Sequence, residues 1–433
     1  MKQIFTGLVL VGALLVRADG YEFSNVTAIQ HWPWEQKVDI EFDVKQPSGR
    51  QSRCLGARLE LTATVGGVST VLDAATLSDT YVFGEGHKRI VWNPMSQFAG
   101  QDMRNVQLSF RTLEEDVPLG YLVVKIEDGT WCYKPLSFSN EVNTTTYKTT
   151  HLAFRYIPST VSSSWNDMTG GIDTFRIGSD GSRATVLGMN STDVYVEKQA
   201  DIRLTKGFFM GVFPLTRAQY VGLGYVLTGI PTNEVPVRGL SYNFLRGNDT
   251  ATGYCYPTNR AVAADSLIGR LRRRTHLNFD LPTEAQWEYA YRAGSTGEYF
   301  FVESGNLQNQ IREYAAFDTG KTLPVGSKKP NPWGLYDLIG CCHQWTTTLG
   351  RTAVSTDADL TYRCRHEDAT DPIGGIPNYN NPYRWCRGSH YQAASVMSRV
   401  CRASYRFGMR TDFSNTSESG NAGCRLALTL DIQ

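Results

Sequence analysis

Side chains that could bind a metal or act as nucleophiles are concentrated toward the C-terminal end of this chain of 433 residues. Thiolates and imidazoles bind soft and borderline metal ions, and an accessible thiolate can also exchange with other thiols. The spacing of these residues matches no known zinc pattern. The alternative to a metal site or a reactive thiol is that the cysteines form disulfides or are buried, and that the histidines are isolated surface or core residues. The residues concerned are Cys341, Cys342, His343, Cys364, His366, Cys386, His390, Cys401 and Cys424.

The first residues have the pattern of a secretory signal. Lys2 is followed by an apolar run from Ile4 to Val16, and Ala18-Asp-Gly20 offers small residues for cleavage. We therefore predict a signal peptide over residues 1–20 and a mature protein that is secreted, periplasmic or on the cell surface. No later apolar run approaches the length that a bilayer requires, so we expect no membrane span after the signal is removed.

Charge and cysteine content narrow the class of protein further. The net charge of +1 provides no general attraction for nucleic acid, so we expect none as a partner. Nine cysteines in an exported chain favour disulfides, and the odd number leaves at least one thiol without a partner in the same chain. The basic run Arg270–Arg274 is interpreted as the solvated face of a helix that begins near Asp265, with polyanion binding as the alternative.

The clearest helix signal lies at Leu281–Gly294. Thr283 and Gln286 form a capping box, in which each side chain bonds a backbone N–H at the start of the helix. Trp287, Ala290 and Tyr291 share one apolar stripe, Glu284, Glu288 and Arg292 fill the opposite face, and Gly294 is expected to end the helix. A second capping box is predicted at Thr216 and Gln219.

Residues 21–130 are dominated by strand patterns. Apolar and polar residues alternate from Val38 to Val44, from Leu59 to Val65 and from Val106 to Phe110, and Tyr121–Ile126 is apolar throughout. With turn residues between them, these strands predict an all-β sandwich of immunoglobulin or fibronectin type that acts as a spacer or an interaction module. The polar residues 131–150 are predicted to be a linker to a second domain at 151–433.

Several strings in that second domain resemble the formylglycine-generating-enzyme family, also called the sulfatase-modifying-factor family. The resemblance covers roughly residues 151 to 430 and is specific because the strings occur in the family's order. It implies an α+β fold of the C-type-lectin-like kind. The matching strings are Val235–Tyr242, Leu281–Gly294, Pro330–Gly340, Arg387–Tyr391, Cys401–Arg406 and Gly423–Ala427.

In active members, the resemblance implies a pair of cysteines that binds copper(I) and uses oxygen to convert a substrate cysteine into formylglycine. Alignment on Arg387-Gly388 puts Ala393 and Ser398 at those two positions, and treating a missing glycine as a deletion puts Gln392 and Met397 there. Neither alignment provides a soft thiolate. A copper cofactor is therefore not expected at these positions.

Displaced residues could replace that pair. Cys386 and Cys401 lie on either side of it, His390 stands where the family has serine, and His343 and His366 could join them in a different metal site. The commoner outcome for such residues is a disulfide or a buried thiol, and a surface or core histidine.

The family also implies a structural calcium site, at a turn that here reads Gly340-Cys-Cys-His-Gln-Trp345. The matching positions are Asp337, Gly340, Cys342 and Gln344. Calcium prefers oxygen ligands, which Asp337 and Gln344 still offer. A turn held by packing around Trp345 is the alternative.

The sequence thus leads to two functions. The first is an exported, non-catalytic protein that binds a protein, peptide or glycan, because the family's strings are present while its cysteine pair is replaced. The alternative is a copper-dependent formylglycine-generating oxidase that uses the displaced thiols. The family's iron-dependent sulfoxide-synthase branch carries its histidines on an extra helical domain, which the strand-rich residues 21–126 do not provide.

Overall fold

A computed structural model shows two compact units. The N-terminal unit comprises residues 1–121, 132–138 and 431–433, and the C-terminal unit comprises residues 122–131 and 139–430. None of the helices in the described part of the chain is long and apolar enough to cross a membrane. The structure describes residues 8–9, 16–18, 20–30, 37–47, 55–101, 106–189, 196–229, 231, 233–247, 262–317, 321–350, 369–372, 383–412 and 420–429.

The first sheet of the N-terminal unit is antiparallel, with strand order β1-β3-β4-β8 and with β2 also paired to β3. Ile40 of β4 lies opposite Ile90 of β8. Two short strands, β1 and β2, come from the segment expected to be a signal peptide, which stays a prediction. The strands are β1 (Leu8–Val9), β2 (Val16–Ala18), β3 (Tyr21–Gln30), β4 (Val38–Lys45) and β8 (Gly86–Trp92).

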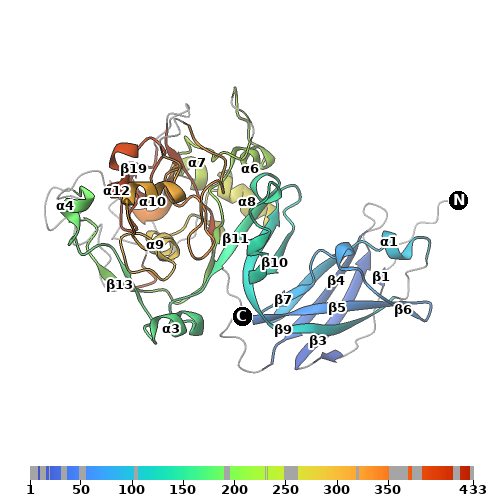
Figure 1. Ribbon diagram of the computed structural model, residues 1–433. Helices are drawn as coiled ribbons and strands as arrows, with labels where there is room; N and C mark the ends of the chain where they lie inside the picture. Colours follow the sequence, from blue (N-terminus) through green and yellow to red (C-terminus); the bar gives the residue numbers. More distant parts are fainter. Residues whose placement is uncertain are drawn as a thin grey trace. The chain divides into compact units, whose positions relative to one another are not determined.

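The other strands of this unit pair around β5, which contacts β6, β7 and β9 (Figure 1). Buried residues of both groups of strands share one hydrophobic cluster. Within it, the rings of Phe42 on β4 and Phe110 on β9 lie 4.8 Å apart. The strands predicted from alternation are thus confirmed, while an immunoglobulin or fibronectin type stays a prediction. The bounds are β5 (Leu55–Val65), β6 (Val68–Val71), β7 (Tyr81–Phe83) and β9 (Gln107–Lys125).

Residues 131–150, which the polar sequence suggested as a linker, instead carry secondary structure. They form β10 (Trp131–Pro135), η3 (Leu136–Asn140) and α2 (Thr146–Thr149). Gln219, from the second capping box, donates to the carbonyl of Tyr147 at 3.0 Å. Turn-forming polar residues are therefore also used here for contacts within a packed structure.

The C-terminal unit combines small sheets with short helices, as a mixed α and β domain was expected to do. In one sheet β11 pairs with β14, β14 pairs with β21, and β21 pairs with β15. In another sheet β18 lies between β16 and β19. A third joins β12, β13 and β17. The strands are β11 (His151–Ile157), β12 (Phe175–Ile177), β13 (Ala200–Arg203), β14 (Phe208–Gly211), β15 (Phe279–Asp280), β16 (His343–Leu349), β17 (Ala369–Thr370), β18 (Tyr383–Arg387), β19 (Phe407–Arg410), β20 (Ala422–Gly423) and β21 (Ala427–Leu428).

The helices of this unit begin at side-chain caps in most cases. Ser162, Thr216, Ser241, Ser266, Thr283 and Asn306 each accept a backbone N–H from the first turn of the helix that follows. The helices are α3 (Ser163–Thr169), α4 (Ala184–Leu187), α6 (Arg217–Gly222), α7 (Tyr242–Arg246), α8 (Leu267–Thr275), α9 (Glu284–Arg292), α10 (Leu307–Tyr314) and α12 (Met397–Val400).

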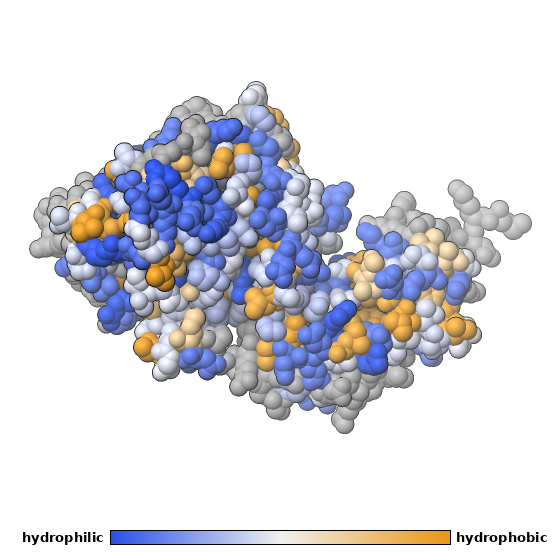
Figure 2. Space-filling model, in the orientation of Figure 1, coloured by the Kyte–Doolittle hydropathy of each residue, from blue (hydrophilic) through white to orange (hydrophobic). Residues whose placement is uncertain are grey.

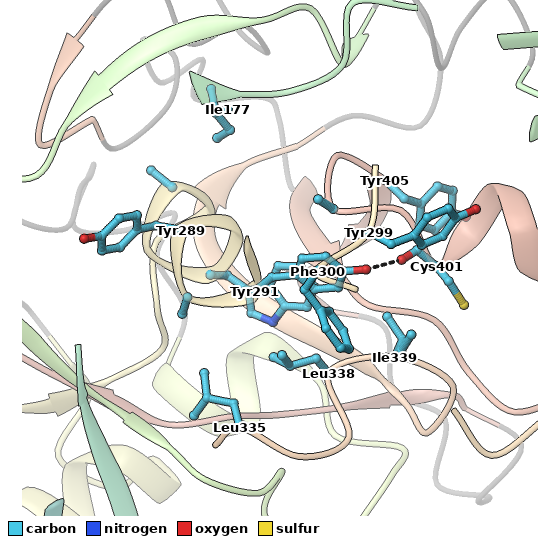
Figure 3. Packing of buried hydrophobic residues seen from close by; sticks show 14 of the residues in the cluster. Ile177, Tyr289, Tyr291, Tyr299, Phe300, Leu335, Leu338, Ile339, Cys401 and Tyr405 are labelled. Carbon is cyan, nitrogen blue, oxygen red and sulfur yellow. Dashed lines mark hydrogen bonds between the residues drawn. The ribbon is translucent and has the colours of Figure 1, made fainter. Parts of the chain in front are cut away.

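Helix α9, which carries Tyr289 and Tyr291, lies in the hydrophobic core of the C-terminal unit (Figure 3). Both predicted capping boxes, at Thr283 and at Thr216, are present. The residue in left-handed conformation at the end of α9 is Ala293, with a φ of 46°, and Gly294 follows it. All nine residues of α9 are buried, so the polar face is not solvated as a surface helix would require.

Buried arginines explain how that polar face is accommodated. Glu288 is fully buried and pairs with Arg387 and with Arg292, whose distance to it is 2.7 Å. Glu284 pairs with Arg406. Burial alone would raise the pKa of Glu288, but the surrounding guanidiniums outweigh it and lower that pKa below its ordinary value.

Apolar side chains on opposite sides of α9 pack into the hydrophobic core. Trp287 and Tyr291 stack with their rings 5.3 Å apart, and Tyr289 lies edge-on to Trp165 at 4.9 Å. These residues belong to a cluster that also takes in Phe300, Leu338 and Ile339 (Figure 3). On the face of the molecule shown in Figure 2, hydrophilic residues predominate over the C-terminal unit and hydrophobic ones form scattered groups.

Removal of the buried carboxylate should be costly. We expect Glu288→Ala to lower the free energy of unfolding of the C-terminal unit by about 3–5 kcal/mol, because it leaves buried guanidiniums unpaired. Chemical denaturation followed by tryptophan fluorescence measures this change. The matched control is Lys329→Ala, which breaks the exposed Lys329–Glu313 pair and should leave the midpoint unchanged. Equal midpoints for Glu288→Ala and the unmodified protein would show that the network contributes little.

Candidate functional site

The two positions that the resemblance assigns to the family's cysteine pair lie between β18 and the end of α12. Ala393 is half-buried and packs against the hydrophobic core of the C-terminal unit. Ser398 is half-buried, and its main-chain oxygen accepts the Tyr299 hydroxyl at 2.5 Å. In the alternative alignment, Met397 is in the core and Gln392 is exposed. Neither alignment therefore places a cysteine at these positions, and a copper(I) site of the family's type does not fit the residues present.

Cys401 is one of the two displaced candidates, and it is fully buried. Its sulfur lies 3.5 Å from the Ser389 hydroxyl oxygen, and its main-chain oxygen accepts the Tyr291 hydroxyl at 2.6 Å (Figure 3). Burial raises the pKa of the Cys401 thiol to about 12, against the opposing effect of the bond to Ser389. At neutral pH this group is therefore a protonated thiol rather than a nucleophilic thiolate.

Cys386, the other displaced candidate, lies on β18 opposite Trp345 and is also fully buried. Burial, and then the negative charge that Cys342 would carry, raise the pKa of Cys386 well above its ordinary value. Cys342 has the same effect on the pKa of Cys424, and its sulfur is 3.7 Å from that of Cys341. Cys386 therefore lies within electrostatic range of Cys342, whereas Cys401 contacts Ser389.

The expected disulfides do not occur among the cysteines that the structure describes. Cys132, Cys341, Cys342, Cys386, Cys401 and Cys424 are all free thiols. Cys364 and His366, which were also candidates for a rebuilt metal site, lie outside the described residues, as do Cys54 and Cys255.

The histidine candidates contact each other rather than the two displaced thiols. The rings of His390 and His343 lie 5.1 Å apart, and His343 stacks on Phe407 at 4.6 Å. Burial lowers the pKa of His343 to about 3, so the ring is neutral at neutral pH. Within the described ranges, no three side chains from histidine, cysteine, aspartate and glutamate are grouped so as to hold a metal ion.

The residues proposed for calcium lie together, but their oxygens are occupied by donors. The Asp337 carboxylate accepts the N–H of Gly326 at 2.7 Å, and its main-chain oxygen accepts both Gln344 at 2.9 Å and Arg425 at 3.0 Å. The Gln344 side-chain oxygen accepts Arg425 at 2.9 Å as well. A buried guanidinium thus already provides the positive charge at this turn.

The remaining members of the proposed calcium set, Gly340 and Cys342, also lie in the interior. Gly340 donates its N–H to Ser389 at 3.1 Å, and the Cys342 side chain is fully buried. Burial raises the pKa of Asp337 to about 6, although the N–H of Gly326 and the charges of Arg425 and Lys148 act in the opposite direction. As placed, these residues do not fit a calcium ion, which requires six to eight oxygen ligands.

A polar and aromatic surface lies beside the replaced cysteine positions. The Arg238 guanidinium lies 5.0 Å from the centre of the Tyr391 ring and donates to Asn421 at 3.0 Å. Asn421 in turn donates to Gln392 at 3.0 Å. We call this group, together with the adjoining rings, the 391 surface. It consists of Arg238, His390, Tyr391, Gln392, Phe407 and Asn421.

The sequence did not reveal this surface as a unit. Arg238 and Asn421 are 183 residues apart, and Phe407 carries no chemical signature. The one signal available was that Arg238 lies in a string resembling the family's Pro-Val segment.

Comparison with known proteins supports the family resemblance. The family model described as "Sulfatase-modifying factor enzyme 1-like domain" matches residues 175–430. The formylglycine-generating enzyme of Mus musculus is 28% identical over 211 residues, which cover 41% of this chain and 55% of the mouse protein. The Bos taurus enzyme is 26% identical over 210 residues, which cover 41% and 54%. This chain therefore spans about half the length of these curated relatives.

Among solved structures, the chain is similar to Treponema denticola variable protein 1. That comparison has a TM-score of 0.42 and 16% sequence identity, and it covers 65% of this chain and 96% of the other.

The buried thiols should resist chemical modification. We expect Cys386 and Cys401 to remain unlabelled by iodoacetamide at pH 8 in the folded protein, because both are buried with raised pKa values. Labelling in denaturant should modify both, and peptide mass spectrometry identifies each site. Glutathione added to the same sample provides an exposed thiol for comparison. Rapid labelling of Cys401 in the folded protein would mean that this thiol is accessible.

Calcium should not stabilise the protein through the turn at Asp337. We expect the melting temperature in excess calcium and in chelator to agree within about 1 °C. If calcium did bind, a hundredfold excess over its Kd would raise the free energy of unfolding by roughly 2.7 kcal/mol, which would shift the melting temperature by several times that margin. Scanning calorimetry measures both conditions. A calcium-dependent rise that Asp337→Asn abolishes would overturn this expectation and establish the family's calcium site here.

Proposed function

The chain belongs to the sulfatase-modifying factor family, and we propose that this member is an exported binding protein rather than an oxidase. Its ligand would be a protein, peptide or glycan. The observation that carries this proposal is the replacement of the family's cysteine pair by Ala393 and Ser398 on a scaffold that is otherwise retained. A fold performs a reaction only through the groups at its site, and the reactive pair is missing.

The surroundings of the other thiols support the same conclusion. Cys386 and Cys401 are fully buried, and burial raises the pKa of each. A thiol that is neither exposed nor ionised cannot exchange with the cysteine of a substrate peptide. The displaced thiols thus lack the two properties that the oxidase alternative requires.

The 391 surface supports a role in recognition. It presents an arginine over an aromatic ring, an amide pair and the exposed Phe407, whose side chain is 40% accessible. Arginine and aromatic residues are enriched at binding hot spots, and the hydrogen bonds between Arg238, Asn421 and Gln392 hold these groups in place before a ligand arrives.

We also propose a fold for each of the two units. The C-terminal unit would have the C-type-lectin-like fold that the resemblance implies. The N-terminal unit would be an immunoglobulin- or fibronectin-type sandwich that acts as a spacer, since its strands share one hydrophobic cluster.

Binding should depend on the 391 surface. Ligands would be selected with the full chain from a glycan array and a displayed peptide library. We expect Arg238→Ala to weaken binding of a selected ligand by about tenfold, because it removes both a charged donor and the partner of Tyr391. Arg176→Ala is the matched control, because Arg176 is an exposed arginine of β12 that pairs with Asp201 of β13. Equal losses for both variants would contradict the assignment of this surface.

The oxidase alternative has a direct test. The full chain, supplied with copper(I) and oxygen, should not convert the cysteine of a sulfatase-type peptide into an aldehyde, which hydrazide trapping and mass spectrometry detect. Aldehyde formation that Cys386→Ala or Cys401→Ala abolishes would overturn the binding-protein proposal and establish an oxidase with displaced thiols.

A further inference from the structure

We propose that α8 and the residues after α6 form a binding site for a sulfated or phosphorylated sugar. The site is a surface hollow with a volume of about 510 Å³. It uses none of the residues of the 391 surface, so it stands independently of the function proposed above. We call it the arginine hollow, after the residues that line it, including Leu223, Tyr225, Arg270, Leu271, Arg273 and Arg274.

The helical repeat places the three arginines on one side of α8. Arg270, Arg273 and Arg274 lie at positions i, i+3 and i+4 and are exposed, while Leu267 and Leu271 are buried against the core. Like charges at these spacings repel one another and destabilise a helix. An anion bound beside the three guanidiniums would offset this weak repulsion.

No carboxylate within the described residues compensates these charges. Arg272, between them, differs because it pairs with Asp280 at 3.3 Å. Among the described residues, the side-chain hydrogen bonds of the other three arginines go to main-chain carbonyl groups. Arg270 donates to Asp265 at 3.2 Å, Arg274 donates to Ile126 at 2.9 Å, and Arg273 donates to Ala264.

Tyr225 also lines the hollow. The Arg270 guanidinium lies 5.4 Å from the centre of its ring, and Arg270, Arg273 and Arg274 all lower the pKa of its phenol, although burial raises that pKa by more. The Tyr225 hydroxyl is buried and has no hydrogen-bond partner among the described residues. Such a group is unfavourable unless a ligand accepts its proton in a hydrogen bond.

The aromatic residues next to Tyr225 hold its ring in position. Tyr220 stacks on it at 4.8 Å, and Phe244 lies edge-on at 5.2 Å. The hydroxyl donor is therefore preorganised, which reduces the entropy lost when a ligand binds.

The chemistry of these groups defines the ligand. Guanidinium groups donate paired hydrogen bonds to sulfate and phosphate oxygens, and a phenol donates one more. A hollow of about 510 Å³ is in the range of small-molecule sites and exceeds the size of a bare anion. The hollow is also lined by the exposed Gly224 and the half-buried Tyr225, beside which the carrier of the anionic group can lie. A sugar that carries one sulfate or phosphate ester satisfies both requirements.

Calorimetric titration of the full chain at low salt tests the proposal. The probes are glucosamine 6-sulfate, glucose 6-phosphate, inorganic sulfate and glucose. We expect both esters to bind, with the tighter one identifying the anionic group, and glucose to show no binding. Inorganic sulfate should bind at least about tenfold more weakly than the sulfated sugar, since it lacks contacts for the carrier. The absence of binding by both esters, or equal affinity for bare sulfate, would overturn the proposal.

Variants locate the binding. We expect Arg270→Gln/Arg273→Gln to weaken binding of the tighter ester by more than tenfold and Tyr225→Phe by about threefold to tenfold. Arg270→Lys keeps the charge and should lose less than Arg270→Gln, and it serves if the double variant does not fold. Arg176→Gln, which removes an exposed arginine elsewhere, should bind as the unmodified protein does. Unchanged affinity in the double variant and in Arg270→Gln would place the ligand outside the arginine hollow.

Discussion

The C-terminal unit depends on the pairing of buried carboxylates with buried guanidiniums around α9. Glu284 and Glu288 are enclosed by packing, and each would be strongly destabilising without its partners Arg406 and Arg387. Arg387 also donates to the carbonyls of Ala403, Ser404 and Tyr405, so one side chain joins α9, β18 and the segment before β19. These pairs fix the positions of elements that are far apart in sequence.

The same packing determines which chemistry remains open to the thiols. Tyr291 of α9 bonds the main chain of Cys401, and β18 carries Cys386 into the interior beside Arg387. Cysteines held in this way are stable as small apolar residues, and their raised pKa values keep them protonated. The packing around α9 and β18 therefore both uses residues of the family strings and keeps the thiols of Cys386 and Cys401 unreactive.

Buried and exposed arginines of the C-terminal unit differ in the partners that their guanidinium groups have. Within the C-terminal unit, Arg425 has its guanidinium occupied by the carbonyls of Gly211, Val212 and Asp337. In contrast, Arg270 and Arg273 are exposed and meet no described carboxylate. Buried cations thus stabilise the fold, whereas these exposed cations remain available to an anionic ligand, which is the basis of the proposed arginine hollow.

The sequence by itself determined the features that depend on neighbours within a few residues. The capping boxes at Thr216 and Thr283 and the alternating strands could be predicted because their partners lie three or two positions away. The tertiary structure alone decided that the polar face of α9 is buried, that Arg425 occupies the oxygens expected for calcium, and that Arg238 meets Asn421. The physical reason is that a polar side chain is equally compatible with water, a metal or a distant counter-charge until packing selects its partner.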